Sequence, residues 1–258
     1  MKPQLGDQTM PPPMSDDTRT APTAPAAQPT ARVRVPLRER KFYQTRLRLA
    51  RALRDRLGST PLDELNVRDL CEEVEVSEAT FFNYFPRKTD LLAYLGQLWS
   101  VELAWHGQQA LARGESGLTA VQQVFEQAAR QFQAAPGVAG ELIAWQARAR
   151  TRHAPEPLSA NERRLAFPEQ TGIEALADQG LEQTLTSALQ RAVDQGELPH
   201  NTHLPIVMVS LLSIFHGVAL ALRLGNPSGI GAMYRQQLTI LWSGVRQVAG
   251  TRSSVAGT

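Results

Sequence analysis

Cysteine is almost absent from the chain, which has only Cys71 among its 258 residues. A single cysteine excludes an intramolecular disulfide and any metal site built from several cysteines. Aromatic residues are few, and the small net positive charge gives no indication of the partner. Cys71 lies on the apolar face of a predicted short helix, so we expect a small buried core residue rather than an exposed redox sensor.

Motifs of catalysis and cofactor binding are also missing. The sequence has no glycine-rich phosphate loop, no nucleophile elbow and no His, Cys and Asp cluster at metal-ligand spacing. Of the five histidines only His200 and His203 form a close pair, and two ligands in a proline-bounded loop are a weak basis for a zinc site. We therefore expect no enzymatic activity, no cofactor and no bound metal.

The N-terminal segment, residues 1–35, is rich in Pro, Thr, Ala and Gln and has almost no large apolar side chains. It cannot bury enough surface to offset the entropy of ordering, so we predict a disordered tail. No signal peptide is evident, which favours a cytoplasmic protein. Arg32, Arg34 and Arg38 are compatible either with a solvated segment or with a basic arm that enters a minor groove.

Helical periodicity dominates the rest of the chain, and no stretch alternates with the period of a strand. The predicted fold class is therefore all-α. Positive charge is concentrated between Arg38 and Arg56, where eight basic residues accompany two acidic ones. The expected helices cover residues 37–57, 66–74, 77–85, 88–112, 118–135, 142–152, 173–195, 204–222 and 229–248, with a short helical turn at 161–165.

The most informative stretch is residues 66–92, NVRDLCEEVEVSEATFFNYFPRKTDLL. Asn66 and Ser77 have the short polar side chains of N-caps for two short helices, and a proline ends the second helix. The first helix carries an apolar stripe, while Phe81 and Phe85 share one face of the second. Two short helices at a sharp corner are typical of a helix-turn-helix that inserts into the major groove.

The run VSEATFFNYFPRKTDLL closely resembles the DNA-binding signature of the tetracycline-repressor (TetR/AcrR) family. The resemblance implies an N-terminal three-helix helix-turn-helix DNA-binding domain over residues 36–86 and a larger C-terminal helical ligand-binding and dimerisation domain over residues 87–250, followed by a frayed tail at 251–258. Two positions depart from the family pattern: Glu75 replaces the usual glycine of the corner, and Phe82 replaces a common tyrosine. The matched positions are Val76, Ser77, Thr80, Phe81, Phe82, Tyr84, Phe85, Lys88 and Leu91.

Roles in DNA binding follow from this resemblance and from side-chain chemistry. Residues at the start of the second helix can reach base edges, short hydroxyls can contact phosphates or bases, and helix N-terminal amides can face a phosphate. Tyr84 and Lys88 match family positions that grip the DNA backbone. The candidate DNA-binding residues are Asn66, Val67, Ser77, Glu78, Ala79, Thr80, Phe82, Tyr84 and Lys88.

The resemblance also implies a small-molecule effector pocket in the C-terminal domain and a homodimer formed through the last two long helices. Residues 204–222 are apolar and uncharged, which suits burial between a core and a partner subunit better than a membrane span, because polar residues interrupt the stretch. The candidate pocket residues, all polar or aromatic groups on otherwise apolar helices, are Trp105, His106, Trp145, Arg148, Phe215 and His216.

The predicted function is therefore that of a DNA-binding transcriptional regulator. We expect a homodimeric repressor that binds a palindromic double-stranded DNA operator and is released by an unknown small-molecule effector. Two alternatives remain open: a DNA-architectural protein without an effector, which would show little sequence preference, and a regulator anchored in a membrane through residues 204–222.

Overall fold

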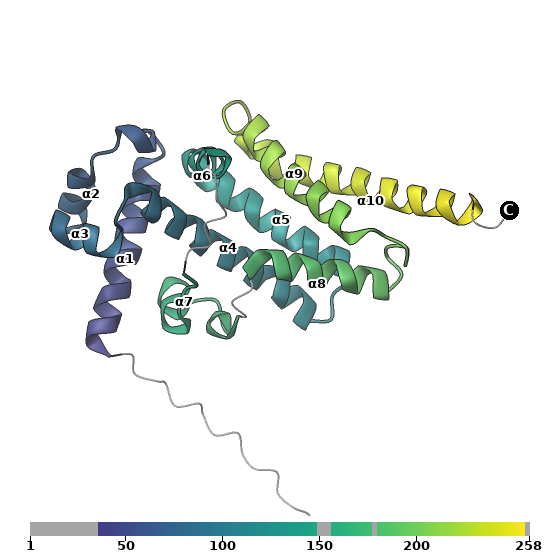
Figure 1. Cartoon of the computed structure of the whole chain (residues 1–258), viewed down its shortest axis with the longest axis horizontal. Helices are drawn as coiled ribbons and strands as arrows, with labels where there is room; N and C mark the ends of the chain where they lie inside the picture. The colour runs from purple at the N-terminus through teal and green to yellow at the C-terminus, as the bar shows by residue number, and fades with distance from the viewer. Residues whose placement is uncertain (1–35, 149–155, 177–179, 256–258) are drawn as a thin grey trace, which may run out of the picture. The chain divides into compact units, whose positions relative to one another are not determined.

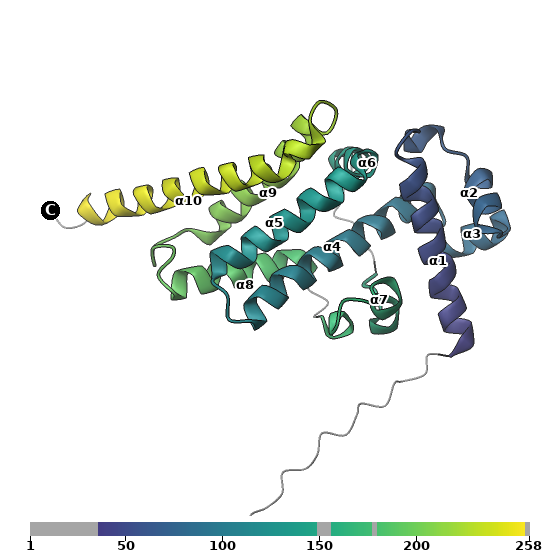
Figure 2. The same cartoon turned by 180° about the vertical axis from the view of Figure 1, so that it is seen from behind.

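The computed structural model describes residues 36–148, 156–176 and 180–255, and these residues form helices and connecting turns with no strand among them. The described residues belong to one compact unit, shown from two sides in Figures 1 and 2. The expected tail, residues 1–35, lies outside the described residues. The α-helices are α1 (Leu37–Arg56), α2 (Val67–Val74), α3 (Glu78–Tyr84), α4 (Lys88–Ala112), α5 (Gly117–Ala134), α6 (Pro136–Arg148), α7 (Ala160–Ala166), α8 (Gly180–Asp194), α9 (Leu204–Leu222) and α10 (Ile230–Val255).

The helix-turn-helix forms as the sequence predicts. The Asn66 side chain accepts a hydrogen bond from the Arg68 amide at 3.0 Å and caps α2, and Ser77 Oγ accepts one from the Thr80 amide at 3.1 Å and caps α3. The corner between the two helices falls on Glu75, whose φ of 57° lies in the left-handed region. A residue with a Cβ costs about 1 kcal/mol in this conformation, which explains why glycine is usual there.

A first hydrophobic core joins these short helices to the start of α4. Leu49 and Leu53 of α1, Phe81 of α3 and Leu91 and Leu92 of α4 are all fully buried in it. Cys71 belongs to the same core, where burial raises the pKa of its thiol. The prediction of an inert core cysteine is therefore confirmed.

A second core lies between α5, α8, α9 and α10 and the C-terminal half of α4. Phe125 and Tyr234 meet edge to face at 5.0 Å in its centre, and the Tyr234 hydroxyl donates to the Phe215 carbonyl oxygen at 2.6 Å. The two cores meet near the start of α6. There Gly137 lies so close to the end of α1 that an added Cβ would overlap the Leu57 carbonyl oxygen.

Three helix boundaries differ from the expected ones. Pro136 begins α6 instead of only ending α5, because the fixed φ of proline suits the first position of a helix. The helix expected from residue 173 is a 3₁₀ turn, η2 (Ile173–Ala175), and α8 begins at Gly180. Ile173 is buried in the first core, whereas the apolar residues of α8 are buried in the second. The chain therefore breaks between them instead of continuing as one helix. Finally, α10 continues to Val255 and includes part of the expected frayed tail.

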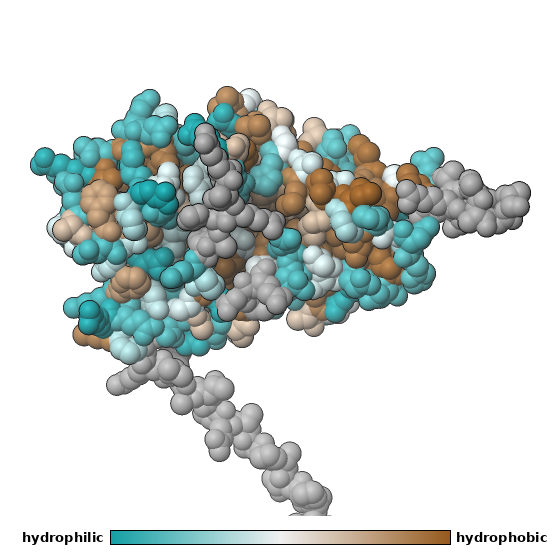
Figure 3. Space-filling model, viewed as in Figure 1, coloured by the Kyte–Doolittle hydropathy of each residue, from teal (hydrophilic) through white to brown (hydrophobic). Residues whose placement is uncertain are grey.

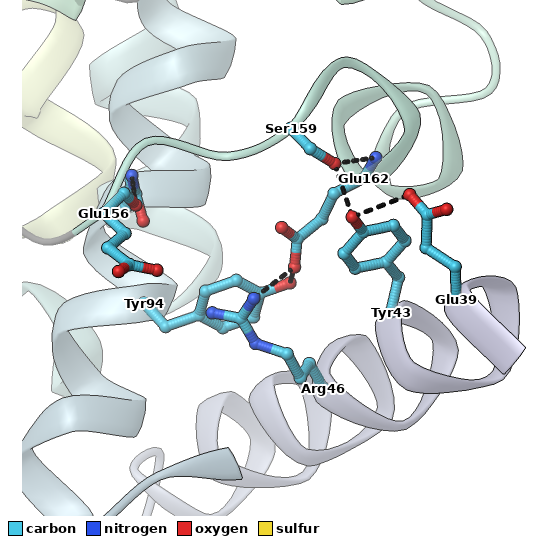
Figure 4. Close-up of polar contacts among 8 residues, drawn as sticks. Glu39, Tyr43, Arg46, Tyr94, Glu156, Ser159 and Glu162 are labelled. Atoms are coloured by element: carbon cyan, nitrogen blue, oxygen red, sulfur yellow. Dashed lines mark hydrogen bonds and ion pairs between the residues drawn. The ribbon is translucent and has the colours of Figure 1, made fainter.

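The α7 segment, residues 156–176, is fixed to α1 and α4 by a buried carboxylate. Glu162 is only 2% exposed. Its Oε1 accepts a hydrogen bond from the Tyr94 hydroxyl at 2.7 Å and forms an ion pair with Arg46 Nη1 at 3.0 Å. The Arg46 guanidinium in turn covers the Tyr94 ring, 4.2 Å from its centroid. Figure 4 shows the three side chains converging from α7, α4 and α1.

A second set of hydrogen bonds lies beside this cluster and joins α1 to the α7 segment. Ser159 Oγ donates to the Tyr43 hydroxyl at 2.9 Å, and that hydroxyl donates to Glu39 at 2.9 Å (Figure 4). Asn161 Nδ2 also donates to Glu39, at 3.2 Å. These hydrogen bonds add directional contacts between α1 and α7 to the apolar packing of Leu158, Leu165 and Phe167 in and against the first core.

Burial controls the titration of Glu162. Desolvation raises the pKa of its carboxyl above the usual value, although Tyr94 and Arg46 both lower it. A group of this kind binds its proton more tightly in the folded than in the unfolded state. Its contribution to folding is complete below the usual glutamate pKa of about 4.3 and is lost as pH rises through the higher folded pKa.

We predict that the difference in unfolding free energy between the wild type and Glu162→Gln becomes less favourable to the wild type as pH rises above about 4.3. Glu174 supplies a matched control on the same segment. A hydrogen bond from its own backbone amide and the Arg164 side chain lower the pKa of its carboxyl, so its contribution changes only below the usual value. Urea unfolding over pH should therefore give a sloping difference for Glu162→Gln and a flat one for Glu174→Gln; a flat difference for both would contradict the assignment.

Candidate functional site

The outer face of α3 is exposed. Phe81 and Phe85 are buried and hold α3 and its C-cap against the first core. Their burial turns Glu78, Ala79 and Phe82 outward, and all three are exposed. Asn83, on the same face, is also exposed but did not stand out as a site residue in the sequence. The sequence does indicate its exposure, because Asn83 lies between Phe81 and Phe85, whose burial on one face turns Asn83 away from the core.

The hydroxyl groups and amides assigned to DNA binding lie at the N-termini of α2 and α3. The Ser77 and Thr80 hydroxyls lie 2.9 Å apart and hydrogen bond to each other, so they form one polar group at the start of α3. Asn66 is exposed and Val67 is half-buried against the first core. The side chains of Asn66 and Ser77 thus cap α2 and α3. If either side chain contacts a phosphate, it does so while it also caps its helix.

Tyr84 lies at the C-terminal end of α3, where it is held by α1. Its ring is half-buried and meets the ring of Phe42 edge to face at 4.8 Å. Among the described residues its hydroxyl has no hydrogen-bond partner. The phenol is thus held firmly at one end while its polar group can accept or donate a further bond.

Lys88 has an unexpected structural role. Its ammonium Nζ donates to three carbonyl oxygens, those of Leu62 at 2.9 Å, Asp63 at 3.1 Å and Leu65 at 2.7 Å. These carbonyls belong to a 3₁₀ turn, η1 (Leu62–Glu64), and to the residue after it, a segment that leads from α1 into α2. An ammonium group has three donors, so this turn uses all of them.

Positive charge on α1 divides into paired and exposed groups. Arg46 is held by Glu162, Arg56 pairs with Glu73 at 2.9 Å, and Arg54 pairs with its neighbour Asp55. The remaining basic residues of α1 are exposed and form a positive surface on this helix. They are Arg38, Arg40, Lys41, Arg48 and Arg51.

A cavity of about 620 Å³ lies inside the C-terminal helices. Its walls come from α4, α5, α6, α8 and α9 and are mostly apolar. Gln131 is the most buried polar residue of the wall, and its Nε2 donates to the Glu102 carboxylate at 2.8 Å. Gln97 and Pro157 bring α4 and the α7 segment to the rim, where Gln97 Nε2 donates to the Glu156 carbonyl at 2.6 Å.

The cavity contains three of the six side chains expected to line a pocket, Trp145, Phe215 and His216. The other three lie elsewhere. Trp105 donates from Nε1 to the Thr171 carbonyl at 3.1 Å with His106 against its ring, and Arg148 lies 3.7 Å from Asp63 near the helix-turn-helix. Sequence reasoning missed Trp99, Phe125, Phe132 and Gln131 as cavity residues, because core and cavity side chains follow the same helical stripe.

Metal binding has no support in the described part of the chain, where no three His, Cys, Asp or Glu side chains gather around one point. His216, the histidine of the cavity wall, has its Nδ1 3.0 Å from the Leu212 carbonyl oxygen. It is thus a hydrogen-bonded residue of α9.

We predict that Lys88→Met lowers the free energy of unfolding by about 1–3 kcal/mol, because three carbonyl oxygens lose a charged donor. Arg87→Met is the matched control, since Arg87 is exposed and pairs only with Asp90, and it should leave stability nearly unchanged. Urea unfolding measures both. A Lys88→Met protein as stable as the wild type would show that the ammonium is dispensable for the fold and is free to bind a phosphate.

Comparison with known proteins agrees with this geometry. Residues 51–95, which span the end of α1 through the start of α4, match the family model for bacterial regulatory proteins of the tetR family. No curated protein matches the chain.

Solved structures share the fold at low sequence identity. A structure described as the molecular basis for control of antibiotic production by bacterial hormones has 18% identity and a TM-score of 0.54, over 79% of this chain and 98% of the other. FadR of Thermus thermophilus, a TetR family transcriptional repressor in complex with lauroyl-CoA, has 20% identity and a TM-score of 0.51, over 76% and 92%. GusR of Salmonella enterica has 16% identity and a TM-score of 0.50, over 79% and 96%.

The sequence signature, the helix-turn-helix geometry and the shared all-helical fold agree with one another. The prediction of the family is confirmed, and so is the all-α fold with a helix-turn-helix domain followed by a larger helical domain. Residues 51–95 thus carry the helix-turn-helix module of bacterial regulatory proteins of the tetR family, and the chain shares its helical fold with solved structures of that family.

Proposed function

We propose that the protein is a homodimeric repressor that binds a palindromic operator and is released from it when a small molecule enters the cavity. The outer face of α3 carries the proposal. It presents four exposed side chains on a helix that is capped by Ser77 and anchored by Phe81. Side chains held in this way can reach base edges in a major groove without reorganising the helix.

A dimer through α9 and α10 is supported by apolar surface that the single chain leaves uncovered. Val207 and Leu211 of α9 point into the second core, while other apolar residues of the two helices are exposed. Apolar residues gather over α9 and α10 in Figure 3. A surface of this kind suits a second copy of the chain. The exposed residues are Ile206, Val209, Leu212, Leu220, Ile240 and Val248.

The same apolar surface could be covered by lipid, since α9 is long and apolar enough to cross a membrane by length and composition. We favour the dimer because α9 packs against α5, α6, α8 and α10 along its length. A spanning helix would have to leave that second core. We therefore propose a cytoplasmic protein without a membrane partner.

Effector binding is supported by the cavity, whose volume falls within the range of about 300–1,000 Å³ that is usual for small-molecule sites. Met208, Leu211, Phe215 and His216 bring the inner side of α9 into its wall, so an occupant would press on the helix whose outer side forms the proposed dimer contact. A ligand shifts the equilibrium only by the difference in its affinity for the two conformations. Couplings of about 1–3 kcal/mol are typical.

A route from the cavity to the DNA-reading helices runs through the α7 segment. Gln97 at the rim of the cavity holds the Glu156 carbonyl, and six residues later Glu162 holds Arg46 of α1. Movement of α4 around a ligand would therefore act on α1 through two hydrogen-bonded contacts. We propose this segment as the coupling element between effector and operator.

The experiment begins with selection of duplexes by the purified wild-type protein from random DNA. Anisotropy then compares the selected duplex with a scrambled duplex of equal length at two salt concentrations. We expect the selected sequence to be palindromic and to bind at least about a thousandfold more tightly than the scrambled one. Equal affinity for the two duplexes would contradict a specific regulator and favour an architectural protein held by the exposed cations of α1.

A pair of variants tests the dimer by light scattering and by binding to the selected duplex. Val209→Asp places a charge in the exposed face of α9, and Leu224→Asp places one on an equally apolar residue in the turn after it, 82% exposed. Light scattering should show that Val209→Asp shifts the protein from two chains towards one and weakens binding to the selected duplex, whereas Leu224→Asp changes neither. A Val209→Asp protein that stays dimeric would place the interface elsewhere.

A further inference from the structure

Phe82 is an exposed aromatic residue in the middle of the outer face of α3. The residue is 46% exposed, and its ring touches that of Phe81 edge to face, with ring centroids 5.3 Å apart. The contact fixes one edge of the ring and leaves the rest in water, which is unfavourable for an apolar surface. Without a hydroxyl, Phe82 cannot hydrogen bond to a phosphate as tyrosine would, so a contact between its ring and DNA would be apolar.

The thymine methyl group is the apolar feature that a major groove offers. Among the four bases only thymine presents a C5-methyl at the groove edge, and alanine and phenylalanine side chains contact it. Ala79 lies three residues before Phe82, on the same face of α3, and is exposed as well. The two side chains together form a small apolar surface on a helix of seven residues, about 10 Å long, which is close to the width of the groove.

Asn83 adjoins this apolar surface with a carboxamide. It is exposed, and among the described residues no side chain or backbone group hydrogen bonds to its amide. A carboxamide has a donor and an acceptor side by side, which matches N7 and the N6 amino group of adenine. Adenine and thymine are therefore the bases that the chemistry of Asn83, Phe82 and Ala79 fits.

Resting on the proposed function, we infer that α3 reads adjoining thymine and adenine bases in each half-site of the operator. Phe82 contacts the thymine methyl beside the small side chain of Ala79, and Asn83 binds the N6–N7 edge of the adenine. Glu78, at the start of the helix, lies outside this pair of contacts. Two base pairs of each half-site would therefore set the sequence preference. The contact at each depends on a group, the thymine methyl or adenine N7, that can be removed from the DNA without disturbing base pairing.

The test uses the duplex that the wild-type protein selects from random DNA. Each thymine is replaced singly by uracil, which lacks only the methyl group, and each adenine by 7-deazaadenine, which lacks N7. We expect one uracil position per half-site to weaken wild-type binding about fourfold, the effect of one buried methyl-sized group. One 7-deazaadenine position next to it should weaken binding by about fivefold or more.

Variants assign each effect to its side chain. Phe82→Ala should abolish the sensitivity to uracil and keep the sensitivity to 7-deazaadenine, Asn83→Ala should do the reverse, and Phe82→Leu should retain part of the methyl preference. Equal thermal stability and equal affinity for scrambled DNA serve as controls, since both residues are exposed.

Two results would overturn the inference while the proposed function stands: a selected palindrome that is insensitive to every uracil, or a sensitivity to uracil that survives Phe82→Ala. Selection that enriches no sequence at all would overturn the proposed function and this inference together.

Discussion

The buried carboxylate of Glu162 is the constraint on which the arrangement of the DNA-reading end depends. A carboxylate removed from water needs a compensating cation or hydrogen bond, and here both come from other helices, Arg46 of α1 and Tyr94 of α4. The pair fixes the α7 segment against α1 at one defined position, which apolar packing alone does not do. The helix that supports α2 and α3 therefore also carries the contact through which the rest of the chain can move it.

The N-terminal helices could be predicted closely because their signals are local. N-caps at Asn66 and Ser77, paired aromatics four residues apart and a terminating proline specify α2 and α3 without reference to the rest of the chain. Glu75 takes the left-handed conformation of the corner although it stands in place of the usual glycine. The domain boundary at residue 86 stays a prediction, and the first core extends past it into α4 and η2.

Other features depend on contacts between distant residues and could not be predicted. Nothing in the sequence around Lys88 indicates that its ammonium binds two carbonyls of η1 and that of Leu65, all more than twenty residues away. The cavity has the same character: Phe125 and Phe132 follow the stripe of an ordinary core helix, and only the positions of α6, α8 and α9 leave a space beside them. Trp105 and His106 looked equally suitable, but their side of α4 faces the turn after α7.

Hydroxyl-radical footprinting of the wild-type protein on its selected duplex would show whether two copies of α3 are held at a fixed separation. We expect two protected patches related by a twofold axis, with centres about 10 base pairs or a multiple of that apart, so that both recognition helices face the same side of the DNA. A single protected patch, or uniform protection along the duplex, would contradict it.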